Sequence, residues 1–165
     1  MSKSISGICL TFAIAASLSS PAFGQADAKM KGNYNFWQAM GWQQQAQHQA
    51  RSLYYYGQTQ NPNPAQSQEH AAAARTAVTK AQTSLAELKK AHPTNKDAQE
   101  SIMKIEAVQK KVLEHCDKCD KALMKGDHSA AGQCSADIVH DLHEANAELK
   151  KLQKALDLHE EVPKK

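Results

Sequence analysis

One stretch of the sequence repeats its inward-facing positions at a spacing that suits only a helix packed among other helices. Seven residues fall in alternating steps of three and four: Ile102, Ile105, Gln109, Val112, Cys116, Cys119 and Leu123. This spacing keeps one face of a helix against its neighbours. A second stretch repeats the pattern with Ile138, Leu142, Ala145, Leu149, Leu152 and Leu156. We therefore expect two core-facing helices, joined by a turn at Gly126-Asp127.

The rest of the chain predicts two more helices and no strand. Ala, Gln, Lys, Glu and Leu dominate, and these residues are strong helix formers. The expected helices run over about 35–56, 64–91 and 96–125, and from after Asp127 toward His159. The second has a thinner inward stripe, made of His70, Ala74, Ala77, Ala81, Leu85 and Leu88. The first has a polar, weakly patterned middle, so its buried face stays open. Short connections make consecutive helices antiparallel, which predicts an all-α, up-down-up-down four-helix bundle.

The N-terminus has the pattern of a cleaved secretory signal. A positive charge at Lys3 precedes a short apolar run at 8–16, and Ala22 and Gly24 suit a cut before Gln25. The run is about half the ~20 residues that a membrane span needs. We expect a signal peptide at 1–24 and a single bundle domain at 25–165 with frayed ends. The mature protein would then be periplasmic or secreted, with no membrane span.

Several function classes are excluded by what the sequence lacks. The formal charge is only +3, and no basic stripe alternates with aromatics, so nucleic acid is not an expected partner. No Gly-rich phosphate loop, nucleophile elbow, HExxH or Glu-x-x-His motif occurs. The residue after Cys119 is Asp120, so the haem attachment motif is also missing. We expect a protein that is not an enzyme and holds neither haem nor nucleotide.

Three of the four cysteines follow the signal, and they flank the Gly126-Asp127 turn. Counting outward equally from that turn puts Cys119 level with Cys134. Cys116 then lies roughly 4.5 Å further along, at about 1.5 Å per residue. The same count across the turn at Pro93-Thr94 places His70 opposite Asp117, near the thiols.

This cluster has two interpretations. A tetrahedral Zn(II) ion could be held by Cys116, Cys119, Cys134 and His70. Two or three of the sulfurs alone would instead suit Cu(I). Alternatively, Cys119 and Cys134 form a disulfide and Cys116 is a buried apolar residue beside it. That bridge would close a 16-residue loop, worth about 3 kcal/mol in the chain-entropy model. An odd thiol count in an oxidising compartment leaves one cysteine over in any monomer.

Two other groups of residues have weaker functional interpretations. His140, His143 and Glu144 could chelate a metal at the surface, although the inward pattern turns them outward and favours a solvated polar face. The first helix concentrates the aromatics Phe36, Trp37, Trp42 and Tyr54-Tyr55-Tyr56. A helix cannot bury three consecutive tyrosines, so at least one should face solvent, a protein partner or a second copy of the chain.

Overall fold

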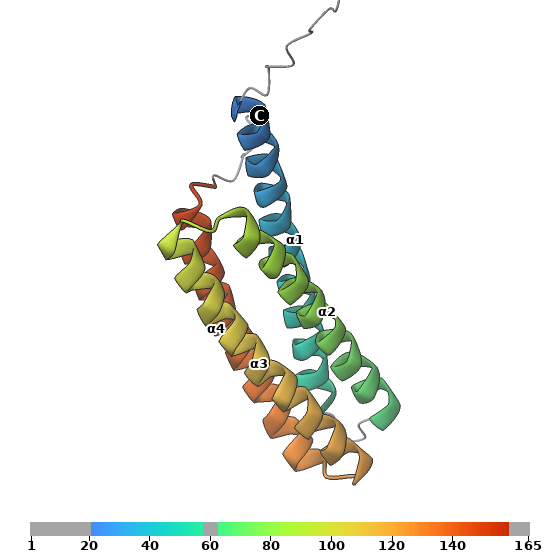
Figure 1. Cartoon of the computed structure of the whole chain (residues 1–165). Helices are drawn as coiled ribbons and strands as arrows, with labels where there is room; N and C mark the ends of the chain where they lie inside the picture. Colours follow the sequence, from blue (N-terminus) through green and yellow to red (C-terminus); the bar gives the residue numbers. More distant parts are fainter. Residues whose placement is uncertain (1–20, 58–62, 159–165) are drawn as a thin grey trace, which may run out of the picture.

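The computed structural model describes residues 21–57 and 63–158, and side chains from Gly32 onward. Its four helices are α1 (Pro21–Gly57), α2 (Pro64–Ala91), α3 (Lys96–Met124) and α4 (His128–Ala155). They pack in a ring in which α1 contacts α2 and α4, and α3 contacts the same two helices. Consecutive helices run antiparallel (Figure 1). The predicted all-α four-helix bundle is confirmed, and the described part of the chain contains no strand.

The helix boundaries agree with the predicted ones except at the start of α1 and the end of α4. Asn63, Asn95 and Asp127 cap α2, α3 and α4, each accepting a hydrogen bond from a first-turn amide. α1 begins at Pro21, well before the expected start near residue 35, because 25–34 is rich in helix formers and Pro21 suits a first position. The first turns of α1 extend beyond the other helices (Figure 1).

α4 ends earlier than expected, at Ala155. The amide of Leu158 donates to the carbonyl of Gln153 at 3.0 Å, and Asp157 adopts a positive φ of 53°. This reversal closes the helix and returns the buried Leu158 to the core. Residues 1–20, most of the expected signal peptide, and 159–165, the expected frayed tail, lie outside the described residues.

The structure settles which faces of α1 and α2 are buried. The core positions of α1 are Phe36, Ala39, Gln43, Ala46, Ala50 and Leu53, again in steps of three and four. Those of α2 include Ser67, Ala71, Ala74, Val78, Ala81, Leu85 and Leu88. His70 therefore lies one residue off the inward row and is only half-buried, which differs from the expected inward stripe. The small side chains on both helices allow them to approach closely.

A pair of buried amides divides the core into two apolar clusters. Gln43 of α1 accepts a hydrogen bond from Nε2 of Gln109 of α3 at 3.0 Å, across the diagonal of the bundle. One cluster, with Leu85, Ile105 and Leu149 among its members, lies toward the end where α2 meets α3. The other cluster holds the cysteines and lies toward the α3–α4 turn.

A glycine fixes the approach of α1 to the end of α2. A Cβ atom at Gly32 would lie 2.5 Å from Nε2 of His92, a buried nitrogen without a hydrogen-bond partner among the described residues. We expect Gly32→Ala to cost about 2 kcal/mol of unfolding free energy, because the imidazole must shift. Gly41 has open space around it, so Gly41→Ala should instead gain up to about 1 kcal/mol from helix propensity.

Urea denaturation of both variants, and of Gly32→Ala combined with His92→Ala, measures this contact. His92→Ala should remove most of the loss of stability caused by Gly32→Ala. An equal cost with and without the imidazole would show that His92 is not the obstacle.

Candidate thiol site at the turn end of the bundle

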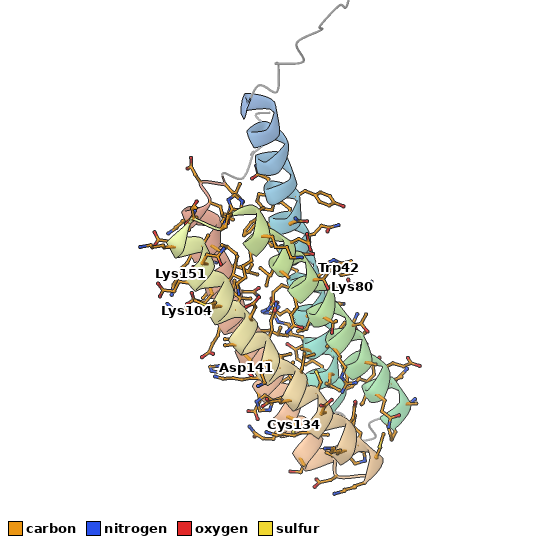
Figure 2. All side chains as sticks on the ribbon, in the orientation of Figure 1. Trp42, Lys80, Lys104, Cys134, Asp141 and Lys151 are labelled. Carbon is orange, nitrogen blue, oxygen red and sulfur yellow. The ribbon has the colours of Figure 1, made fainter. Side chains whose placement is uncertain are left out.

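The three cysteines lie in the same apolar cluster, near the turn that joins α3 to α4. Cys116 and Cys119 are fully buried on α3, and the half-buried Cys134 packs against the cluster from α4. The thiol of Cys119 lies 3.8 Å from the carbonyl oxygen of Ala131, one helical turn before Cys134. Figure 2 shows Cys134 toward this end of the bundle. None of the three cysteines is bridged.

Burial sets the acidity of these thiols. It is the main cause that raises the pKa of both Cys116 and Cys119 to about 12. The neighbouring groups Cys134, Asp120 and Cys116 raise the pKa of Cys119 further, so Cys119 lies between the other two cysteines in this cluster. Burial also raises the pKa of Cys134, followed by the charge of Asp137. All three thiols are therefore protonated at neutral pH.

An ion-pair network borders the thiols on the α2 side. Arg75 of α2 donates from Nη2 to Asp117 at 2.8 Å and to Asp120 at 2.7 Å, both on α3. The guanidinium partly offsets burial at Cys116, since its positive charge lowers the pKa of that thiol. The guanidinium of Arg75 would therefore stabilise a thiolate at Cys116.

His70 does not take the position expected for it. Asp117 pairs with Arg75, which is five residues, or about 7.5 Å, further along α2 than His70. His70 instead faces α1, where Nδ1 lies 2.7 Å from Oε1 of Gln49 and the ring stacks on Tyr56 with centroids 5.1 Å apart. The count from the Pro93-Thr94 turn gave the wrong level because the α2–α3 connection is not a symmetric hairpin.

The donor set therefore differs from the tetrahedral one that the sequence suggested. Within residues 32–56 and 63–158, no three His, Cys, Asp or Glu side chains are arranged to hold a metal ion as they stand. As they stand, the cysteines supply at most two sulfurs and no nitrogen to one ion, and a third sulfur would join only after a rearrangement. Such a set fits Cu(I), which accepts few soft ligands, better than the four-ligand geometry of structural Zn(II).

His115 is the neighbour that the sequence interpretation missed. It lies one turn before Cys119 on α3 and points to α4, with Nε2 3.5 Å from Asp141 and Nδ1 3.8 Å from Asp137. Burial raises the pKa of Asp141, and Figure 2 places that residue midway along α4. The four-residue spacing between His115 and Cys119 was the available signal. This signal was overlooked because His115 lies beside the inward row of α3 and not in it.

The proposed surface chelate is not assembled. His140 and Glu144 are 3.5 Å apart and exposed, as a solvated helix face would be. His143 turns away from them toward α1, where its ring lies 3.2 Å from the amide of Gln47 and 3.4 Å from Arg51.

The aromatics of α1 divide between core and surface. Phe36 is fully buried, and Nζ of Lys80 on α2 lies 4.2 Å from the centre of the Trp42 ring. Figure 2 labels these two residues side by side. Tyr55 is 68% exposed, in accordance with the expectation that at least one of the three tyrosines faces outward. Tyr34 and Trp37 are also exposed.

No protein-family model, curated protein or solved structure matches the chain. None of the helices within the described residues is both long and apolar enough to cross a bilayer.

Thiol labelling tests the burial of the cysteines. At pH 8 a pKa of about 12 leaves roughly a thousandfold less thiolate than the ordinary value of 9.0. We expect iodoacetamide to modify Cys134 first, and Cys116 and Cys119 only as fast as the bundle opens. Peptide mapping at timed intervals measures this, with all three reacting alike in urea as the control. Early modification of Cys116 would contradict the described burial.

Proposed function

We propose that this protein is an exported, non-catalytic helical bundle that binds a single Cu(I) ion through Cys119 and Cys134, with Cys116 as a third sulfur. The observation that carries the proposal is the gathering of three unbridged thiols at one end of a helical core, two of them fully buried. An apolar surrounding also protects a bound soft ion from water and oxidants.

The choice of Cu(I) over Zn(II) rests on ligand number and charge. Zn(II) in a closed site takes four ligands, and His70 is engaged with Gln49 instead. Cu(I) carries a single charge and favours thiolates, so two or three sulfurs suffice. Because the thiols are protonated at neutral pH, binding must release protons and should tighten as the pH rises.

Export is part of the proposal and rests on the leader-like N-terminus alone. In an oxidising compartment, thiols that stay reduced need protection, and deep burial supplies it for Cys116 and Cys119.

The second candidate is a structural or protein-interaction module stapled by a Cys119–Cys134 disulfide. It is favoured by the packing of Cys134 against the buried cluster that holds Cys119, and by the missing three-ligand arrangement in the described part of the chain. Exposed Tyr34, Trp37 and Tyr55 on α1 would then serve a protein partner or self-association.

A Cu(I) competition experiment tests the first candidate. Reduced protein is titrated anaerobically against a chromophoric Cu(I) chelator. We expect binding of one ion, and a loss of at least tenfold in affinity for Cys119→Ala, Cys134→Ala and Cys116→Ala. His70→Ala is the matched control and should bind as the parent does. Unchanged affinity in Cys119→Ala, or a tenfold loss in His70→Ala, would exclude the proposed ligand set.

A further inference from the structure

A groove between α1 and α4 lies outside the thiol cluster and has a distinct chemistry. Its volume is about 410 Å³, within the usual range for a small-molecule site. Gln47 and Arg51 of α1 form one wall, and His143, Asn146 and Lys150 of α4 form the other. The thiol proposal uses none of these residues.

The charged groups of this groove are all basic. Arg51 and Lys150 line it, and no carboxylate does. Neither cation forms an ion pair within the described residues, whereas Lys89, Lys104 and Lys151 on other faces each pair with a glutamate. The acidic residues of this part of α4, Glu144 and Glu148, line the neighbouring groove against α3 instead. Charge is therefore segregated across α4, with a cationic side toward α1.

Hydrogen bonds between the helices hold the polar wall in place. Asn146 donates from Nδ2 to Oε1 of Gln47 at 3.0 Å, and Nε2 of Gln47 lies 3.2 Å from the His143 ring. Arg51 approaches the same ring at only 3.4 Å, which leaves most of its guanidinium N–H groups for another acceptor. The amides of Gln47 and Asn146 and the guanidinium of Arg51 thus provide hydrogen-bond donors that line the same groove.

The base of the groove is apolar. Leu149 is almost fully buried, and the half-buried Met40 lies on the α1 side. A ligand that fills the space would thus place an apolar group on Met40 and Leu149 and an anionic group near Arg51. Guanidinium groups bind carboxylates and phosphates with paired hydrogen bonds, which makes oxyanions the matching head group.

We infer that the α1–α4 groove is a binding site for a small organic oxyanion, a carboxylate or phosphate ester that carries an apolar group. Arg51 and Lys150 neutralise the head group, and Asn146 supplies a neutral donor. The apolar part lies against Met40 and Leu149.

Isothermal titration of the intact chain with phenyl phosphate and with benzoate tests the site, with benzyl alcohol as the neutral analogue. We expect saturable binding of at least one anion with a Kd below about 1 mM, and at least tenfold weaker binding of benzyl alcohol. Arg51→Gln should weaken the anion at least tenfold, because it removes the charge and the paired donors. Lys110→Gln, an exposed position on α3, is the matched control and should bind as the parent does.

The tighter of the two anions identifies the head group. Circular dichroism of each variant establishes that the exposed substitutions leave the bundle folded. No saturable binding up to about 10 mM, equal binding of benzyl alcohol, or an undiminished affinity in Arg51→Gln would overturn the inference. Cys119→Ala should leave anion binding unchanged, so this result is independent of the thiol proposal.

Discussion

Raising the pH from 9 to 12 is expected to destabilise the protein strongly, and the buried thiols are expected to be the main cause. Cys116 and Cys119 have pKa values of about 12 in the fold, against an ordinary value of 9.0. The folded state therefore holds these protons more tightly than the unfolded state. Stability is fully present below pH 9 and falls as the pH rises toward 12. Each thiol accounts for a loss of about 4 kcal/mol at the end of this range.

Lysines and tyrosines also titrate at high pH, so the test compares variants. Urea denaturation at pH 8 and pH 11 gives the loss of unfolding free energy for the parent and for Cys116→Ala. We expect the variant to lose about 3 kcal/mol less than the parent over this interval, although it starts lower at pH 8 because a cavity remains. Cys134→Ala, at a half-buried position, should show a smaller difference. Equal losses in parent and Cys116→Ala would contradict the described burial of the thiol.

Replacing the two buried amides is expected to change stability in opposite directions, depending on whether one or both are removed. Nε2 of Gln43 and Oε1 of Gln109 have no hydrogen-bond partner among the described residues, and the two side chains bond only to each other. Gln43→Leu removes the acceptor of Gln109 and leaves a whole amide unpaired, so we expect a loss of about 2 kcal/mol. Changing both to leucine removes the two unpaired polar atoms of this pair at similar volume and should gain about 2 kcal/mol over the parent.

A double-mutant cycle by chemical denaturation measures this coupling. The exposed Gln133, which donates to Asp137 at the surface, provides the control, since Gln133→Leu should change stability by no more than about 0.5 kcal/mol. Additive effects of Gln43→Leu and Gln109→Leu would show that the two amides do not act as a pair.

The regular parts of the fold could be predicted because each relies on local chemistry. The inward rows of α3 and α4 consist mostly of large apolar residues at an even spacing, and every predicted member of these rows is buried. Asn63-Pro64 and Asp127 marked helix starts to within one residue. The buried face of α1 was hidden because alanine and glutamine occupy most of its core positions. Only the neighbouring helices reveal which alanines face inward.

The site was harder to predict than the fold, because it depends on register between helices. The tight turn at Gly126 fixes the α3–α4 register, and the contact of Cys119 with Ala131 agrees with it. The α2–α3 connection includes Pro93 and Thr94 outside the helices, and Arg75 pairs with Asp117 where His70 was expected. The predicted register of α2 against α3 was wrong by five residues, so His70 was expected beside the thiols, whereas it contacts Gln49 of α1. The groove between α1 and α4 joins residues about a hundred positions apart, which no local pattern could connect.

Intact mass spectrometry tests the central claim most directly: the three thiols are free and together hold one soft ion. Protein recovered from its natural compartment without reductant is weighed under native and denaturing conditions. We expect one copper ion in the native state, and three alkylatable cysteines once the chain is denatured. A metal-free chain that is about 2 Da lighter, with a single reactive cysteine, would establish the Cys119–Cys134 disulfide and contradict the account.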